Sequence, residues 1–288
     1  MTVNDALLMD LADCGSPERL LGVILEHHRD WKPPVDVETF AHTVGILEFR
    51  DLEVDGFVGA LMTDLEKTKG IILSATGMSA VRRRFTVAHE LGHFLIAAHR
   101  GDKRCTSKDL METRRETLHQ KEEAQANRFA AGLLMPKPWF VAQTDDLGPP
   151  VLEHLRILAA TYSVSMEAAA NRYAELTGQT CAFVFLRNGR VRYAQPSRSF
   201  PALALRSGDQ APTDCLRAAV SGGTWAAADA ATWLRGDARS RRPRVRIQVM
   251  DQRDGFQTVL LHIEESIREE EDELDDLVES YTPRFGRR

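Results

Sequence analysis

The residues best placed to do chemistry are two histidines four positions apart, with a glutamate directly after the first. His89, Glu90 and His93 form the pattern H-E-x-x-H. Residues four apart on a helix share one face, so the two imidazoles can converge on one metal ion. The intervening glutamate can then take a proton from a water that the metal activates. The pattern predicts metal ligands at His89 and His93 and a general base at Glu90.

The alternative is that both histidines are ordinary core or surface residues, because so short a pattern also arises by chance. The flanking residues favour a buried helix, since the apolar side chains around the motif recur on both sides of it: Phe85, Val87, Leu91, Phe94 and Leu95. A rigid, partly dry helix is what a catalytic metal site needs.

A third ligand is required, because catalytic zinc usually keeps three protein ligands and one open position. Glu123 is the favoured candidate on a second predicted helix, and Asn127 shares its face, where it can orient a ligand histidine by a hydrogen bond. His99 stands where some zinc proteases place a third histidine, but Ile96 replaces the glycine that breaks their helix. We therefore expect His99 to stay on the helix and to point away from the metal. A solvated charged face is the ordinary interpretation of the remaining candidates, Glu112, Glu116, His119 and Glu122.

The elements that must position this site are predicted to be a small sheet and two helices. Three strands are predicted over residues 46–52, 57–62 and 70–74. Ser79 should cap the helix that carries the motif, and Pro136 should end the second helix, which begins near Thr117. Between them, the polar stretch 100–115 is predicted to be a mobile surface loop. The charged insert 100–121 could serve as a lid or as an edge that selects substrates.

Two further helices are predicted on each side of this core. Ser16 and Pro17 form a helix start, for a helix that should end near Asp30, and a short helix should cover residues 36–42. Residues 148–177 hold two helical patterns whose spacing resembles a helix-turn-helix. The second, MEAAANRYAEL, has one arginine and two glutamates, so direct DNA binding is the less favoured interpretation.

After Gly178, the predicted secondary structure changes from mainly helices to mainly strands. Two strands around Asn188-Gly189 predict a hairpin, and a second hairpin should join residues 244–250 to 256–263. We predict a separate small α+β domain over residues 178–265, followed by a charged tail at 266–288. Trp225 and Trp233 fit ordinary core positions better than a ligand pocket.

Composition suits a cytoplasmic enzyme. The chain has 288 residues, a formal net charge of -5 and 43% hydrophobic residues. No apolar run approaches the roughly 20 residues that span a bilayer, so no membrane association is expected, and the first residues do not resemble a signal peptide. The cysteines are widely spaced without a C-x-x-C pair, which predicts ordinary thiols and neither a disulfide framework nor a cysteine-zinc site: Cys14, Cys105, Cys181 and Cys215.

The run RRRFTVAHELGHFLI, followed on the second helix by E-x-x-x-N-R-F-A-A-G-L-L-M-P, resembles the ImmA/IrrE family of metallopeptidases across roughly residues 20–177. The resemblance implies a zincin-like core of a helix pair and a small sheet. It also implies His89, His93 and Glu123 as ligands, Glu90 as base and Asn127 as the supporting polar residue.

The resemblance implies that the chain is a regulatory endopeptidase. Family members cleave helix-turn-helix repressors of the XRE type and so switch on stress-response or mobile-element genes. The expected metal is zinc, with manganese or iron as alternatives, and the C-terminal domain is expected to be PAS- or GAF-like. Two alternatives remain: a regulator that binds a repressor without cleaving it, and a toxin–antitoxin partner.

Overall fold

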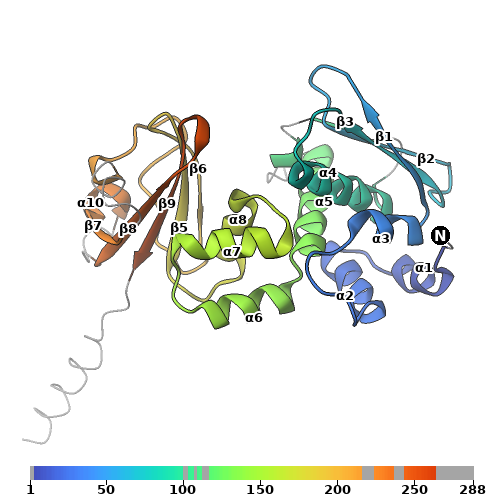
Figure 1. Cartoon of the computed structure of the whole chain (residues 1–288), viewed down its shortest axis with the longest axis horizontal. Coiled ribbons are helices and arrows are strands. Elements are labelled where there is room, and N and C mark those ends of the chain that lie inside the picture. The colour runs from blue at the N-terminus through green and yellow to red at the C-terminus, as the bar shows by residue number, and fades with distance from the viewer. Residues whose placement is uncertain are drawn as a thin grey trace, which may run out of the picture. The chain divides into compact units, whose positions relative to one another are not determined.

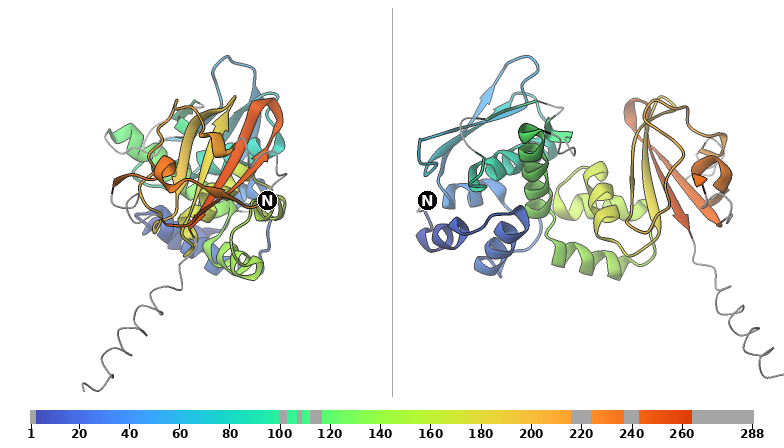
Figure 2. Two further views of the ribbon diagram at one scale, coloured as in Figure 1. Left: turned by 90° about the vertical axis from the view of Figure 1, so that its left-hand side faces the viewer. Right: turned by 180° about the vertical axis from the view of Figure 1, so that it is seen from behind.

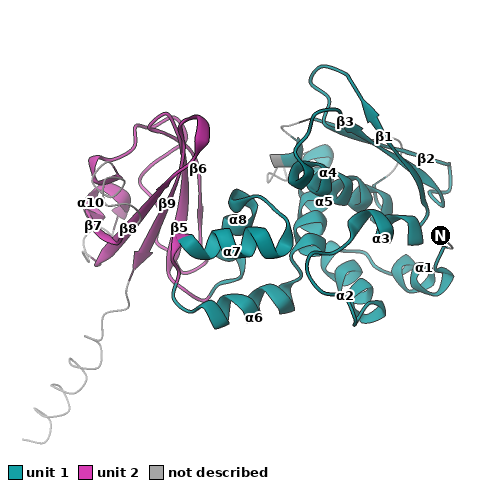
Figure 3. Ribbon diagram, in the orientation of Figure 1, with its two compact units in different colours: residues 1–149, 153–177 teal, residues 150–152, 178–288 magenta. Residues whose placement is uncertain are grey.

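The computed structural model describes residues 3–99, 103–106, 109–111, 117–215, 224–236 and 243–263. The fold is mixed α+β with two sheets (Figure 1). The chain divides into two compact units, the first of residues 1–149 and 153–177 and the second of residues 150–152 and 178–288 (Figure 3). Within the described ranges, no helix has the length and apolar character to cross a membrane. The predicted tail at 266–288 lies outside the described residues.

Unit 1 begins with three capped helices, α1 (Asp5–Ala12), α2 (Pro17–His27) and α3 (Val37–Thr43). The Ser16 hydroxyl accepts a hydrogen bond from the Arg19 amide, and Asp36 caps α3 in the same way through the Thr39 amide. The predicted starts of α2 and α3 are thus confirmed by their caps. Helix α1 was not predicted from the sequence.

The sheet of unit 1 has the order β1-β3-β2-β4. Strands β1 and β3 run parallel, and β2 pairs antiparallel with both β3 and β4. The predicted strands are present at nearly the predicted residues: β1 is Ile46–Leu52, β2 is Gly59–Thr63 and β3 is Gly70–Ala75. The edge strand β4 (Lys103–Cys105) falls in the stretch expected to be a loop. That prediction was wrong for residues 103–105, because pairing with β2 overrides the polar local sequence.

The two long helices, α4 (Ala80–Leu95) and α5 (Leu118–Leu134), carry the residues of the motif and of the expected third ligand. Ser79 caps α4, and Thr117 forms a capping box with Gln120 at the start of α5, as the predicted starts require. Helix α4 lies against β2 and β3, and α5 crosses it on the side away from the sheet (Figures 1 and 2). The helices approach closely where Gly92 meets Ala126: a methyl group added at position 92 would lie 3.2 Å from the Ala126 Cα.

Three shorter helices complete unit 1: α6 (Lys137–Leu147), α7 (Leu152–Tyr162) and α8 (Met166–Leu176). The predicted pair corresponds to α7 and α8, whereas α6 was not predicted. Arg172 is the one basic residue of α8 and is only 8% exposed. Its guanidinium donates to the Met135 carbonyl, near the end of α5, and to Glu175. Because this cation is used internally, α8 lacks the exposed positive charge that phosphate contacts need.

Unit 2 is built on an antiparallel sheet of order β6-β5-β9-β8-β7. Its strands are β5 (Cys181–Arg187), β6 (Arg190–Pro196), β7 (Ala226–Ala228), β8 (Val245–Asp251) and β9 (Phe256–Ile263). The β5–β6 turn has positive φ at Asn188 and Gly189, 50° and 71°, as a two-residue hairpin turn requires. Both predicted hairpins are present.

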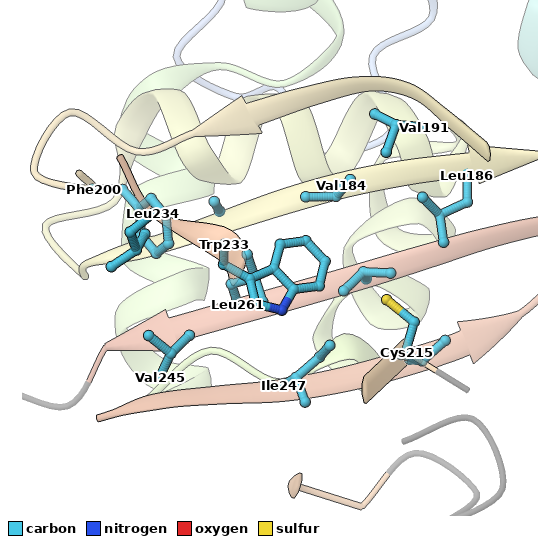
Figure 4. Packing of buried hydrophobic residues seen from close by; sticks show 13 residues of the cluster. Val184, Leu186, Val191, Phe200, Cys215, Trp233, Leu234, Val245, Ile247 and Leu261 are labelled. Atoms are coloured by element: carbon cyan, nitrogen blue, oxygen red, sulfur yellow. The ribbon is translucent and has the colours of Figure 1, made fainter. Parts of the chain in front are cut away.

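The core of unit 2 is apolar. Trp233, at the end of α10 (Ala230–Trp233), is fully buried and packs among Leu234, Ile247 and Leu261 on one face of the sheet (Figure 4). Its indole N–H donates to Asp214 at 2.8 Å. Trp225 is partly exposed and packs beside the Arg246 guanidinium. The core position predicted for both tryptophans is therefore confirmed for Trp233, whereas Trp225 is only partly buried.

Candidate metal centre

Four buried side chains from three elements bring metal-binding atoms together in unit 1. His89 and His93 come from α4, Glu123 from α5 and Cys105 from β4, and their donor atoms all lie within 4.8 Å of one another. None of the four side chains is more than 1% exposed. Such a group, shielded from water, could hold a metal ion.

The spacing of the three predicted ligands fits an ion of the size of zinc. The Nε2 atoms of His89 and His93 are 3.1 Å apart. The Glu123 carboxylate lies 3.1 Å from the first Nε2 and 3.4 Å from the second. Tetrahedral nitrogen and oxygen ligands are about 3.3 Å apart when each is about 2.0–2.1 Å from zinc. The residues present therefore suit the metal that the motif implies.

A hydrogen bond behind His89 leaves its Nε2 lone pair available. Asn127 Nδ2 donates to the Asp109 carbonyl at 2.9 Å, so the Asn127 Oδ1 is the acceptor that faces His89 Nδ1, also at 2.9 Å. His89 must therefore donate from Nδ1. Asn127 thus contacts a predicted ligand histidine.

His93 is supported by His99. The two Nδ1 atoms are 3.0 Å apart, and His99 Nε2 lies 3.0 Å from Gln125 Oε1. Because the amide oxygen only accepts, His99 donates from Nε2 and accepts at Nδ1, and His93 donates from its own Nδ1. The lone pair on His93 Nε2 therefore points to the centre.

The predicted position of His99 was wrong. Helix α4 ends at Leu95, where Ile96 adopts extended backbone angles, so the chain turns and returns His99 to the rear of His93. His99 is fully buried but is not one of the four donors. Lys67 stabilises this turn by donating to three carbonyl oxygens, those of His93, Ile96 and His99. A cation at a helix C-terminus replaces the missing helical donors, which no local pattern revealed.

Glu90 lies beside the four donors without a partner of its own. Its side chain is fully buried, and neither carboxylate oxygen makes a hydrogen bond among the described residues. Burial raises the pKa of Glu90 to about 7, against smaller lowering effects of His89 and the nearby Cys105 thiol. Gly59 of β2 leaves room for this carboxylate: a methyl group there would lie 2.6 Å from Glu90 Oε1.

Two of the donors have pKa shifts that favour the metal-binding form. Burial lowers the pKa of His93 to about 3, which keeps the ring neutral. Burial raises the pKa of Glu123, but contacts with His89 and His93 outweigh it and hold the pKa well below its usual range. Burial also lowers the pKa of His89, but contacts with Glu123 and Glu90 outweigh it and raise the pKa above its usual value.

Cys105 lies among the candidate donors, a position that the sequence did not predict for any of the four cysteines. It sits in an otherwise polar stretch with no neighbouring cysteine or histidine at ligand spacing. Its position is set by the register of β4 on β2, which pairs Cys105 with Gly59. No feature of the local sequence could have revealed it.

The other ligand candidates that the structure describes, Glu122 and His119, lie outside the group. Glu122 is 8% exposed and not among the donors. His119 is 59% exposed and bonds to Asp109 at 3.1 Å, with its Nδ1 3.6 Å from Glu123. Glu112 and Glu116 fall outside the described residues.

The buried histidine–glutamate–cysteine group lies between a helix pair and a sheet edge, with Glu90 beside it, and could hold a metal ion. Residues 47–173 match the family model of the IrrE N-terminal-like domain, Peptidase M78. This part of the chain is an IrrE N-terminal-like domain, which confirms the predicted resemblance.

A solved structure extends the likeness to most of the chain. A Mycobacterium tuberculosis transcriptional regulator has a similar fold, with 14% sequence identity, coverage of 91% of this chain and 89% of that chain, and a TM-score of 0.51. At this identity the likeness concerns the fold alone. No curated protein sequence matches the chain.

Proposed function

We propose that the chain is a metal-dependent endopeptidase in which His89, His93 and Glu123 hold the metal and Glu90 is the general base. The observation that carries the proposal is the Glu90 carboxylate, buried without a partner beside the donors. Leaving a buried carboxylate unpaired costs stability, so its retention calls for a function outside packing. The family match of residues 47–173 supports a peptidase.

The chain's own residues would divide the work of hydrolysis. A bound zinc, or manganese or iron, would supply Lewis acidity that polarises the peptide carbonyl and eases deprotonation of water. Glu90 would accept the water proton and pass it to the leaving amine. Asn127 and His99 would hold the rings of His89 and His93 in the tautomers described above.

We further propose that the substrate is a cytoplasmic helix-turn-helix repressor of the XRE type, whose cleavage releases stress-response or mobile-element genes. The family assignment supports a protein target. The similar structure is named a transcriptional regulator, which is consistent with a role in gene control.

Unit 2 would then serve as a sensory domain of the PAS or GAF kind. Its support is the sheet, in which β5 and β9, from the two ends of the unit, are central neighbours, and the apolar core on one face.

The experiment compares new protein N-termini in cells that express the wild-type chain or Glu90→Gln, with and without DNA damage. The proposal expects a new N-terminus inside a helix-turn-helix repressor only with the wild type, while both purified proteins retain zinc. Identical N-termini in both strains under every condition would refute cleavage.

A second candidate is a regulator that binds a repressor without cleaving it. The observation that favours it is the fourth donor, Cys105, because zinc sites closed by four protein ligands are usually structural. Under this alternative, Glu90→Gln would leave repressor binding and gene expression unchanged. Release of the repressed genes only by the wild type would exclude it.

A further inference from the structure

We propose that Cys105 is a fourth metal ligand that holds the peptidase in a latent state. The inference rests on the proposed function and names a regulatory element of the same site. Three observations carry it: the position of the sulfur among the donors, the unpartnered Glu90 beside it, and the short edge strand on which Cys105 lies.

The sulfur stands at the fourth corner of the donor set. Cys105 Sγ is 3.5 Å from His89 Nε2, 3.8 Å from His93 Nε2 and 3.9 Å from Glu123 Oε2. A tetrahedral sulfur about 2.3 Å from zinc lies about 3.6 Å from nitrogen or oxygen ligands. The three separations are close to that value and to each other. Thiolate is also a preferred ligand of zinc.

A sulfur at this corner fills the place that a catalytic site keeps open. With four protein ligands, no position is left for the water that Glu90 should deprotonate. A purely structural site would have no use for Glu90, whose buried carboxylate bonds to nothing among the described residues. A closed ligand set and a retained base are both explained if the site is catalytic but blocked.

The element that holds Cys105 is suited to release it. Strand β4 has three residues and lies at the edge of the sheet, where β2 is its one partner strand in the described part of the chain. The Cys105 carbonyl accepts from the Val58 amide at 3.3 Å, and Cys105 pairs with Gly59, the residue that makes room for Glu90. A short edge strand contributes few hydrogen bonds, so its displacement costs little.

The same edge is where an extended substrate would pair. Peptides commonly bind by adding a strand to a sheet edge. We place the substrate on β2, in the position that β4 occupies, instead of on the outer edge of β4. Substrate pairing with β2 and coordination by Cys105 therefore exclude each other. Binding of the correct substrate would withdraw the sulfur and open the site.

The ligand role is tested with cobalt(II) in place of zinc, because sulfur bound to cobalt gives a charge-transfer band in the near ultraviolet. Wild type and Cys181→Ala, a matched buried thiol in unit 2, should show the band, and Cys105→Ala should lack it and bind zinc at least tenfold more weakly. A wild-type protein without the band would overturn the proposal, whatever its peptidase activity.

Latency is tested by incubating the zinc-loaded proteins with a peptide library made from a digested proteome and mapping the new N-termini. Cys105→Ala should cleave at least tenfold faster than wild type, and Cys105→Ala with Glu90→Gln should not cleave. Equal cleavage by wild type and Cys105→Ala would overturn latency but leave the proposed function. The cobalt band without cleavage by either protein would refute the proposed function and latency, and would leave a structural site.

Competition is tested with Glu90→Gln, which binds a peptide without cutting it. Saturating a cobalt-loaded Glu90→Gln protein with a cleaved library peptide should weaken the sulfur band by more than half. An unchanged band would show that the substrate and Cys105 do not compete.

Discussion

The two units bury very different groups. Unit 2 encloses Trp233 among aliphatic side chains, and the buried polar residues in its described part, Ser197, Gln248 and Thr258, carry no charge. In unit 1, the buried polar residues include the cluster His89, Glu90, His93, His99 and Glu123. An apolar core needs no explanation beyond packing, whereas a buried ionisable cluster costs free energy that packing does not return. The contrast identifies unit 1 as the unit that contains the candidate functional site.

The largest effect should follow removal of a ligand. Glu123→Ala should lower zinc affinity by more than the roughly 10–100-fold that loss of a supporting partner costs, because it deletes a charged donor. Isothermal titration with zinc measures the change. The neighbouring Glu122→Ala is the matched control and should bind nearly as the wild type does. Similar losses in both variants would mean that Glu123 is no ligand.

The next effect concerns the packing of unit 2. Trp233→Ala should destabilise this unit by about 3–5 kcal/mol, as large-to-small changes in cores do. Hydrogen exchange measured by mass spectrometry should show faster exchange in β5 and β9, with zinc affinity unchanged in unit 1. The partly exposed Trp225→Ala serves as control and should be milder. A loss of zinc binding in Trp233→Ala would show that the two units are not energetically separate.

A smaller effect is expected for the residues behind the ligands. Asn127→Ala should weaken zinc binding by about 10–100-fold, since His89 loses the partner that fixes its tautomer. Gln125→Ala should weaken it less, because Gln125 acts on His93 only through His99. Competition with a chelator measures the zinc affinity of both variants and shows which loss is larger. The reverse order would contradict the hydrogen-bond arrangement described here.

The smallest effect tests whether α5 is held by its own cap. Thr117→Ala removes the side chain that accepts from the Gln120 amide and should cost about 1 kcal/mol of unfolding free energy. Thr117→Ser keeps the hydroxyl and should be nearly neutral. Urea unfolding monitored by circular dichroism measures both. Equal stabilities of the alanine and serine variants would argue against a stabilising cap.

Local patterns were sufficient for much of the fold. Helix starts at Ser16, Asp36, Ser79 and Thr117 could be predicted because a capping side chain acts on amides only two or three residues away. The Asn188-Gly189 turn could be predicted for a similar reason, since its backbone angles favour those residue types. By contrast, α6 has no side-chain cap at its start, and β4 exists only because β2 offers it a partner. Helix α1 was missed although Asn4 caps it by accepting a hydrogen bond from the Leu7 amide.

The candidate site divides in the same way. The sequence by itself determined that His89 and His93 share a face of one helix, because the period of a helix fixes that from spacing alone, and the second motif indicated Glu123 and Asn127. Only the tertiary structure placed Cys105 beside them, turned His99 back onto His93 and left Glu90 buried without a partner. Those relations depend on strand register, on a helix end held by Lys67 and on the close approach at Gly59, which arise between segments distant in the chain.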